Sequence, residues 1–215
     1  MVNRPGISIR PYDRQRDLPA VRECLKSGFG RTEWPIWEFS EQRVIDEMID
    51  LDVRLGSVSL VADVDGIARG ILIGSTRTGP RAELRVIAHS LAFIFRRWVI
   101  DRGSMRPFAR ANLRKIFAGE LPYHLHSPGG RAAGILDLTS MEGHRGGIGT
   151  ALMDAFVEEA RRCGLRRIDV ETDSELAWGF YERYGFGRVR EFPLHIYDYS
   201  LPDRDVTGYI YSLDI

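Results

Sequence analysis

Three glycines between positions 146 and 149 form the part of the sequence whose chemistry can be read most directly. Gly146, Gly147 and Gly149 come just before the stretch 151–162, whose apolar residues have the spacing of an amphipathic helix. Glycine lets main-chain amides approach a ligand closely, and the first turn of a helix leaves several N–H groups without internal partners. With the positive end of the helix dipole behind them, these amides would bind an anion such as a diphosphate.

Two well-known phosphate loops do not fit this stretch, because each needs residues that are missing. A P-loop requires Lys followed by Ser or Thr after its glycines, and Ile148-Gly149-Thr150 stands there instead. A dinucleotide-binding turn requires the spacing G-x-G-x-x-G, which is absent, although Glu171 would supply the acidic residue of the next strand. A tight turn that binds nothing is the alternative interpretation of a Gly-x-Gly sequence on its own.

Two linked stretches resemble the motifs of the GNAT superfamily of acetyltransferases. Residues 144–150, His-Arg-Gly-Gly-Ile-Gly-Thr, resemble the acyl-CoA motif R/Q-x-x-G-x-G/A, whose leading position falls on either His144 or Arg145. Residues 174–186 are similar to Asn-x-x-Ala followed by Tyr-Glu-x-x-Gly-Phe, with Ser174 where Asn is usual. Two motifs at the family's distance are more specific than either alone, and residues 9–11 and 60–70 also resemble family strands.

The resemblance implies a site for the pyrophosphate and pantetheine of coenzyme A. It implies that loop amides bind the pyrophosphate, and that Ser174 belongs to the same site. It also implies that the strand 135–140 binds the pantetheine arm through its main chain near Leu138 and Thr139, with the register open by one residue. The loop residues are Arg145, Gly146, Gly147, Ile148, Gly149 and Thr150.

Tyr181 is the candidate general acid. It matches the family tyrosine whose hydroxyl lies near the coenzyme sulfur and can protonate the departing thiolate. The alternative is an aromatic core stripe formed with Phe180 and Tyr184, next to a helix that ends at Gly185.

Asp137 is a candidate general base, because it lies on the strand before the loop. A buried acid without a partner is costly, so it needs a salt bridge or a functional role. His124 and His126 are equal candidates for the base or for a wall of the amine pocket, and water is the last alternative. The two histidines share one face of a strand but have no third ligand at suitable spacing, so we expect no metal.

The composition excludes several classes of protein. Thirty basic and thirty acidic residues balance along the chain, so we expect binding to neither nucleic acid nor membrane. Cys24 and Cys163 form neither a disulfide framework nor a metal cluster. Residues 1–6 lack the apolar core of a secretory signal, and the apolar stretch 86–100 is too short to span a bilayer. We therefore expect a cytoplasmic protein.

Periodicity and turn residues predict a single α/β (α+β) domain over residues 1–215. Two apolar runs, 57–64 and 68–77, meet at Asp65-Gly66, which is typical of an antiparallel hairpin. The family resemblance implies a central mixed, mostly antiparallel sheet that is splayed at the acyl-CoA strand and flanked by helices. Further strands are expected at 7–10, 132–140, 167–172 and 208–213, and helices at 18–29, 41–49, 151–162 and 175–184.

The segment 80–130 does not match the family, which generally joins the neighbouring strands by a short link. Its apolar spacing predicts an inserted helical pair followed by a short strand at 122–126. The insertion would either cover the acceptor pocket as a lid or present the apolar face of 84–99 to a second subunit, as in a homodimer.

The sequence therefore predicts an N-acetyltransferase. It would move an acetyl or other short acyl group from coenzyme A to a primary amine, on a small molecule or a peptide, by direct attack and without a metal. The alternative is a non-catalytic acyl-CoA sensor. A Rossmann-like nucleotide-binding domain ranks last, because the Asp65-Gly66 hairpin argues against parallel strands throughout.

Overall fold

The computed structural model describes residues 6–29, 42–79, 130–143, 146–195 and 205–215, together with 84, 88–89 and 91–92. Within these ranges, seven strands form one sheet in the order β1-β2-β3-β4-β5-β7-β6. The strands are β1 (Ser8–Pro11), β2 (Val58–Val64), β3 (Ile67–Ser75), β4 (Ala133–Ser140), β5 (Arg167–Asp173), β6 (Gly187–Leu194) and β7 (Val206–Asp214). The helices are α1 (Arg14–Phe29), α3 (Gln42–Leu55), α6 (Ile148–Arg162) and α7 (Gly179–Tyr184).

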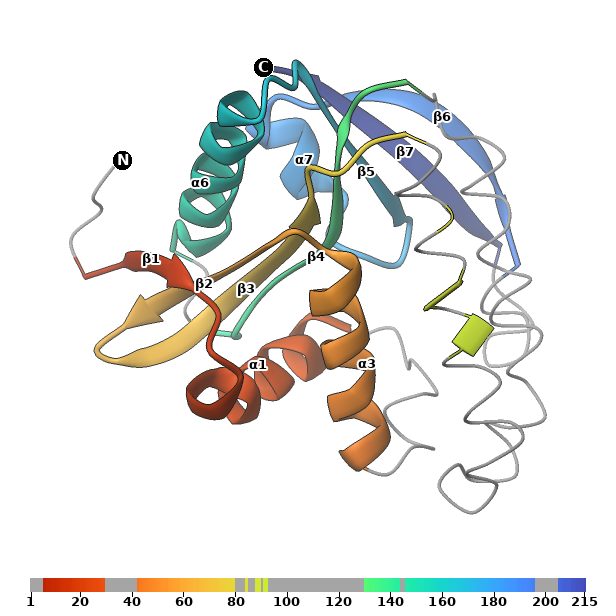
Figure 1. Ribbon diagram of the computed structural model, residues 1–215. Helices are drawn as coiled ribbons and strands as arrows, with labels where there is room; N and C mark the ends of the chain where they lie inside the picture. Colours follow the sequence, from red (N-terminus) through yellow and green to blue (C-terminus); the bar gives the residue numbers. More distant parts are fainter. Residues whose placement is uncertain are drawn as a thin grey trace.

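The sheet is mixed and mostly antiparallel, as predicted. Neighbouring strands run antiparallel except for β4 and β5, which are parallel. The two parallel strands pair only from Ala133 with Ile168 to Ile135 with Val170, and then separate. Strands β5, β7 and β6 thus form a curved wing beside β1–β4 (Figure 1). This separation confirms the predicted splay.

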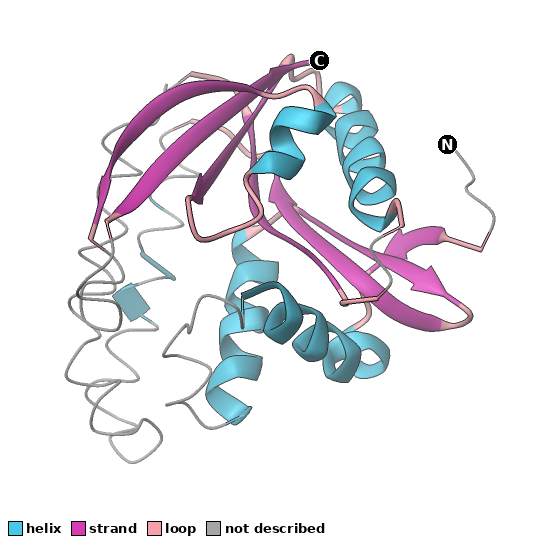
Figure 2. Ribbon diagram, turned by 180° about the vertical axis from the view of Figure 1, so that it is seen from behind, coloured by secondary structure: helices cyan, strands magenta, loops and turns pink. Residues whose placement is uncertain are grey.

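Helices cover the two faces of the sheet with two separate cores. Helix α6 packs on one face, and α1 and α3 pack on the other (Figures 1 and 2). The α6 core includes Phe156, Leu152 and Tyr211, each fully buried. The core on the opposite face centres on Val21, Ile71 and Ile73. The two helical layers therefore clamp β3 and β4 from both sides.

The hairpin between β2 and β3 forms as predicted. Asp65 and Gly66 both have positive φ angles, of 53° and 84°, which the tight turn between twisted strands requires. The carboxylate of Asp63 accepts a hydrogen bond from the Gly66 amide at 2.7 Å and so closes the turn.

One expected helix starts later in the structure than predicted, and the expected helices of the insertion lie outside the described residues. Helix α7 begins at Gly179 and not near Glu175, because residues 174–178 form turns. The Asp173 carboxylate accepts the Glu175 amide at 2.8 Å there, an alternative that Asp offers the backbone in place of a helix. The insertion 80–130 lies outside the described residues apart from positions 84, 88–89, 91–92 and 130, so its helices and strand stay predictions.

A cluster of buried charges fastens β1 to α1 and β2. Arg10 makes two hydrogen bonds to the Asp17 carboxylate, at 2.6 and 2.7 Å, and one to Asp63 at 2.8 Å. Asp17 is only 1% exposed. Burial opposes its ionisation, but the hydrogen bonds from Arg10 and from the Asp13 amide keep the Asp17 pKa below its usual value. The pair is therefore charged, and removing Asp17 leaves the Arg10 guanidinium with Asp63 as its remaining carboxylate partner in this cluster.

Replacing Asp17 by Asn should lower the free energy of unfolding by about 2–3 kcal/mol, because Arg10 loses its bidentate partner. Urea unfolding of the variant measures this loss. The matched control is Asp50→Asn, which breaks the more exposed pair with Arg14 and should cost less than about 1 kcal/mol. Equal losses in the two variants would contradict a special role for the buried cluster.

Candidate active site

The glycine turn places the start of α6 in position to bind an anion. Gly147 has φ 88° and ψ 1°, a left-handed conformation that side chains disfavour, and it precedes the first helical residue, Ile148. The Ala151 amide bonds the Gly147 carbonyl at 2.9 Å, so the earlier amides of the first turn have no partner within the helix. Among the described residues, no side chain caps this turn, and no acidic residue lies in it. The turn is therefore electropositive.

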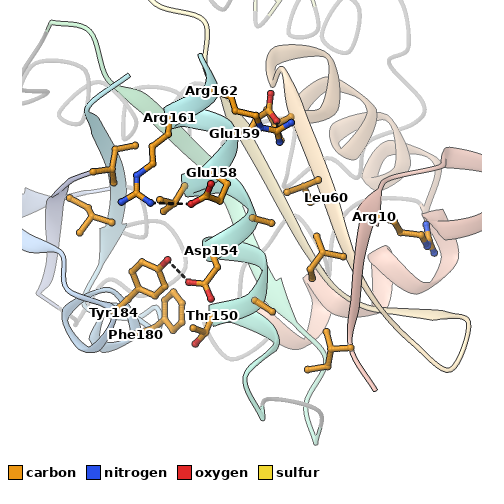
Figure 3. Close-up of a pocket in the computed structure, with 18 of the residues that line it drawn as sticks. Arg10, Leu60, Thr150, Asp154, Glu158, Glu159, Arg161, Arg162, Phe180 and Tyr184 are labelled. Atoms are coloured by element: carbon orange, nitrogen blue, oxygen red, sulfur yellow. Dashed lines mark hydrogen bonds and ion pairs between the residues drawn. The ribbon is translucent and has the colours of Figure 1, made fainter. Parts of the chain in front are cut away.

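Helix α7 packs directly beside the same turn. A Cβ atom on Gly149 would lie 3.2 Å from the Phe180 ring, so glycine allows the close contact. The Tyr184 hydroxyl donates a hydrogen bond of 2.7 Å to Asp154 one turn further along α6 (Figure 3). These contacts fix α7, which carries Tyr181, relative to the anion-binding turn.

Strand β4 contains a bulge at the point where it leaves β5. Its pairing with β3 runs from Ile135 opposite Gly74 to Asp137 opposite Ile73, which leaves Leu136 as an extra residue that is 43% exposed. Ile135 packs in the α6 core, whereas Asp137 lies opposite Ile73 of the other core. The bulge therefore turns the Asp137 side chain to the α1 face of the sheet.

Side chains of β4, the predicted pantetheine strand, pack against both helical layers. Leu138 packs against the α6 core, while Thr139 lies against Gly28 of α1. The Thr139 hydroxyl is buried and has no hydrogen-bond partner. Beyond Ile135, the edge of β4 that faces β5 is no longer paired. Among the described strands, the main chain of β4 therefore has an unpaired edge beyond Ile135, and the roles of Leu138 and Thr139 stay predictions.

The charge of Asp137, on β4, acts on the phenol of Tyr181, on α7. Burial raises the pKa of Asp137 to about 6. Within the described residues, its carboxylate has neither a hydrogen bond nor an ion pair. Burial, and then the negative charge of Asp137, raise the pKa of Tyr181 above its usual value. A carboxylate that is ionised at neutral pH thus interacts with a phenol that stays protonated.

Ser174 has a structural contact of its own. Its hydroxyl accepts a hydrogen bond from the Thr207 amide at 3.2 Å, and its amide donates to the Thr207 carbonyl at 2.9 Å. Ser174 therefore joins the turn before α7 to the start of β7. Its predicted part in the coenzyme site stays a prediction.

Glu171 is a candidate that the sequence analysis did not assign to the site. It follows Val170, the last residue of β5 that pairs with β4. Strand alternation places Glu171 on the face opposite Ile168 and Val170, which lie in the α6 core. Burial, and then the charge of Asp169, raise the pKa of Glu171 to about 7, although its side chain stays accessible to solvent. Acidic residues at alternate positions 169, 171 and 173 were the signal in the sequence.

Several other predicted residues lie outside the described residues. They are His124 and His126, and also His144 and Arg145, so the leading position of the first motif stays open. Within the ranges that are described, no group of three or more His, Cys, Asp or Glu side chains is arranged to bind a metal. No helix in those ranges is long and apolar enough to cross a bilayer.

A groove of about 1040 Å³ runs along the outer side of α6. Thr150 and Phe180 line one end of it, next to the anion-binding turn (Figure 3). The rest is lined by residues of β1 and β2, such as Ile9 and Leu60, and by paired charges of α6, such as Arg161 with Glu158. Neither Asp137 nor Tyr181 lines this groove. It therefore extends from the anion-binding turn and does not include the opening between β4 and β5.

Three solved structures share this fold over nearly the whole chain. Ard1 from Thermoplasma volcanium has 20% identity and a TM-score of 0.56, with 98% of each chain covered. The polyamine N-acetyltransferase of Drosophila melanogaster has 15% identity and a TM-score of 0.58, covering 97% of this chain and 100% of its own. A GNAT acetyltransferase from Elizabethkingia anophelis with acetyl-CoA bound has 12% identity and a TM-score of 0.54, covering 99% of this chain and 100% of its own.

Comparison at the level of sequence gives the family. A search of curated protein sequences finds no match to this chain. The sequence model of the family described as "Acetyltransferase (GNAT) family" matches residues 28–186. This range includes β2 to β5, both predicted motifs and α7. The chain therefore belongs to the acetyltransferase (GNAT) family.

Proposed function

We propose that this protein is an N-acetyltransferase that moves the acetyl group of acetyl-CoA to a cationic primary amine. The observation that carries the proposal is the uncapped first turn of α6 together with the edge of β4 that is unpaired beyond Ile135, on which Asp137 lies. The charge of Asp137 also acts on the phenol of Tyr181. A base that is ionised at neutral pH and an acid that stays protonated are what transfer to an amine needs.

The residues present fit coenzyme A. The first-turn amides of Ile148, Gly149 and Thr150 would bind the pyrophosphate, with the helix dipole behind them and no acidic side chain in that turn to oppose it. The unpaired edge of β4 beyond Ile135 offers main-chain donors and acceptors to the amide groups of pantetheine. When bound, acetyl-CoA supplies the thioester that is attacked.

Asp137 and Tyr181 each have a role in the proton transfers of the proposed reaction. A primary ammonium must lose one proton before its nitrogen can attack, and a second proton after the new C–N bond has formed. Asp137 accepts the first proton, keeps it until the thiolate has left and then passes it to solvent. As the C–S bond breaks, Tyr181 gives its proton to the departing thiolate, which becomes a thiol, and the second proton of the amine restores the Tyr181 phenol. The net products are the amide, free coenzyme A and one proton.

The α1 face of the sheet supports the binding of a cationic acceptor. The coenzyme contacts lie on the face of α6 and α7, so the amine would approach the thioester from the opposite side. Asp137 lies on that opposite face, and Glu171 joins it there one residue beyond the last β4–β5 pair. A solvent-accessible carboxylate without a partner among the described residues suits a substrate ammonium.

A non-catalytic sensor remains the second candidate, and turnover separates the two. Purified protein with acetyl-CoA and a panel of diamines, polyamines and peptide amines should release free thiol and form N-acetyl products. Tyr181→Phe should lower kcat by about a hundredfold, because the thiolate loses its hydrogen-bond donor, while the Kd for coenzyme changes little. Binding of acetyl-CoA without release of thiol from any amine would support the sensor. Full turnover by Tyr181→Phe would exclude its role as acid.

The pH profile should identify the base. A carboxylate accepts a proton only when ionised, so kcat/KM should fall as the pH drops through the Asp137 pKa of about 6. Asp137→Asn should remove this limb and lower kcat/KM by about a hundredfold. Glu171→Gln should keep the limb and raise the amine KM about fivefold. If Glu171→Gln removes the limb, and the wild-type midpoint lies near 7, the two roles are exchanged.

The packing of α7 against the anion-binding turn can be tested by adding one methyl group. Gly149→Ala places a Cβ atom 3.2 Å from the Phe180 ring, so the turn or the ring must shift. We expect a Kd for acetyl-CoA about tenfold higher, measured by calorimetry. The double variant Gly149→Ala/Phe180→Leu, which removes the obstructing ring, should restore most of the affinity. An unchanged Kd in Gly149→Ala would argue against coenzyme binding at these amides.

A further inference from the structure

Arg188, on β6, lies within a cage of aromatic rings. Its guanidinium carbon is 4.3 Å from the ring centroid of Tyr209, 5.3 Å from that of Trp178 and 5.5 Å from that of Tyr211. Trp178 and Tyr209 themselves meet edge to face with centroids 5.9 Å apart. Attraction between the cation and these ring faces favours one position for the side chain.

The guanidinium also directs its hydrogen bonds to three partners. Its Nε donates to the Tyr211 hydroxyl at 3.0 Å, its Nη2 to Glu182 at 2.8 Å and its Nη1 to Glu191 at 3.2 Å. The Tyr211 hydroxyl in turn donates to the same Glu182 oxygen at 2.9 Å. These hydrogen bonds, from Tyr211 and then from Arg188, lower the pKa of Glu182 and keep it charged. Arg188, Tyr211 and Glu182 thus form a closed triangle.

Two members of this triangle, Glu182 and Tyr211, are neighbours of Tyr181. Glu182 is the next residue of α7, and the fully buried Tyr211 ring stacks on the Tyr181 ring with centroids 6.2 Å apart and planes at 29°. The other neighbours of Tyr181 are Phe180 and Phe186, which meet it edge-on at 5.4 and 5.5 Å. Of these four neighbours, only Glu182 and Tyr211 are held by a charged hydrogen-bond network.

A helix of six residues cannot fix its own orientation, because helices this short depend on tertiary contacts. We propose that Arg188 is a positioning residue for Tyr181, acting through Glu182 and Tyr211 to fix the position of the phenol. The proposal rests on the role of Tyr181 in the proposed function. It assigns an effect on turnover to Arg188, a residue of β6 and not of α7.

The kinetic test compares two arginines on the same strand. Arg188→Met keeps an unbranched apolar stem but removes the charge and the three donors. Arg190→Met is the matched control, because the exposed Arg190 guanidinium bonds, among the described residues, only the carbonyl of Val189. We expect Arg188→Met to lower kcat about tenfold, with the KM for acetyl-CoA within about twofold, since a small displacement of a catalytic group lowers the rate without removing substrate contacts. Arg190→Met should match the wild type.

A double variant separates positioning from simple stabilisation. In the Tyr181→Phe background, Arg188→Met should lower kcat by less than about twofold, because the group through which it acts is gone. Arg188→Lys, which keeps the charge but not the planar set of donors, should recover part of the loss. A tenfold loss that persists in the Tyr181→Phe background, or an unchanged kcat in Arg188→Met, would overturn the proposal.

A measurement without any acceptor keeps the proposal testable if no amine is acetylated. The chain contains eight tyrosines, and labelling with 3-fluorotyrosine gives each a 19F signal. The signal of Tyr181 is the one that Tyr181→Phe removes. Arg188→Met should shift or broaden that signal, whereas Arg190→Met should leave it in place. An unmoved Tyr181 signal in Arg188→Met overturns positioning, whatever the outcome of the acetylation assay.

Discussion

The separation of β4 from β5 after three residue pairs is the constraint on which the rest of the structure depends. Strand edges carry N–H and C=O groups that must find partners, so an opening inside a sheet is costly unless each edge is held elsewhere. Here β4 is held by β3 and by α1 against Thr139, while β5 pairs with β7 along its whole length. Each of the two strands is therefore held from its other side, and beyond Ile135 the edge of β4 that faces β5 is unpaired among the described strands. In the proposed function, this edge binds the extended pantetheine arm.

The two faces at this gap have opposite electrostatic character. On the α6 face lies the uncapped first turn of a helix without an acidic residue, and on the α1 face lie Asp137 and Glu171. The same separation of charge suits the proposed substrates, because coenzyme A is an anion and an amine is a cation at neutral pH. The overall charge of the chain is zero, so this selection is local and depends on where the bulge at Leu136 directs Asp137.

The sequence predicts those features that depend on neighbouring residues. The Asp65-Gly66 hairpin, the turn at Gly147 and helix α6 all follow from local preferences, and the structure confirms them. The bulge at Leu136 has no such signal, because it arises from the register of β4 against β3. Arg188 has none either, since its partners at 178, 182, 209 and 211 come from elements that only the fold brings together. Helix α7 starts late because Asp173 offers the backbone a competing turn.

The interaction between Asp137 and Tyr181 couples the two proton transfers in the proposed reaction. While Asp137 is ionised, its charge raises the pKa of the phenol and keeps Tyr181 protonated. When Asp137 accepts the proton of the amine, that charge disappears, and the Tyr181 pKa falls. The phenol therefore becomes a stronger acid at the stage when the thiolate departs. Because the Tyr181 ring is buried and charges are weakly screened there, this electrostatic effect needs no direct hydrogen bond between the two side chains.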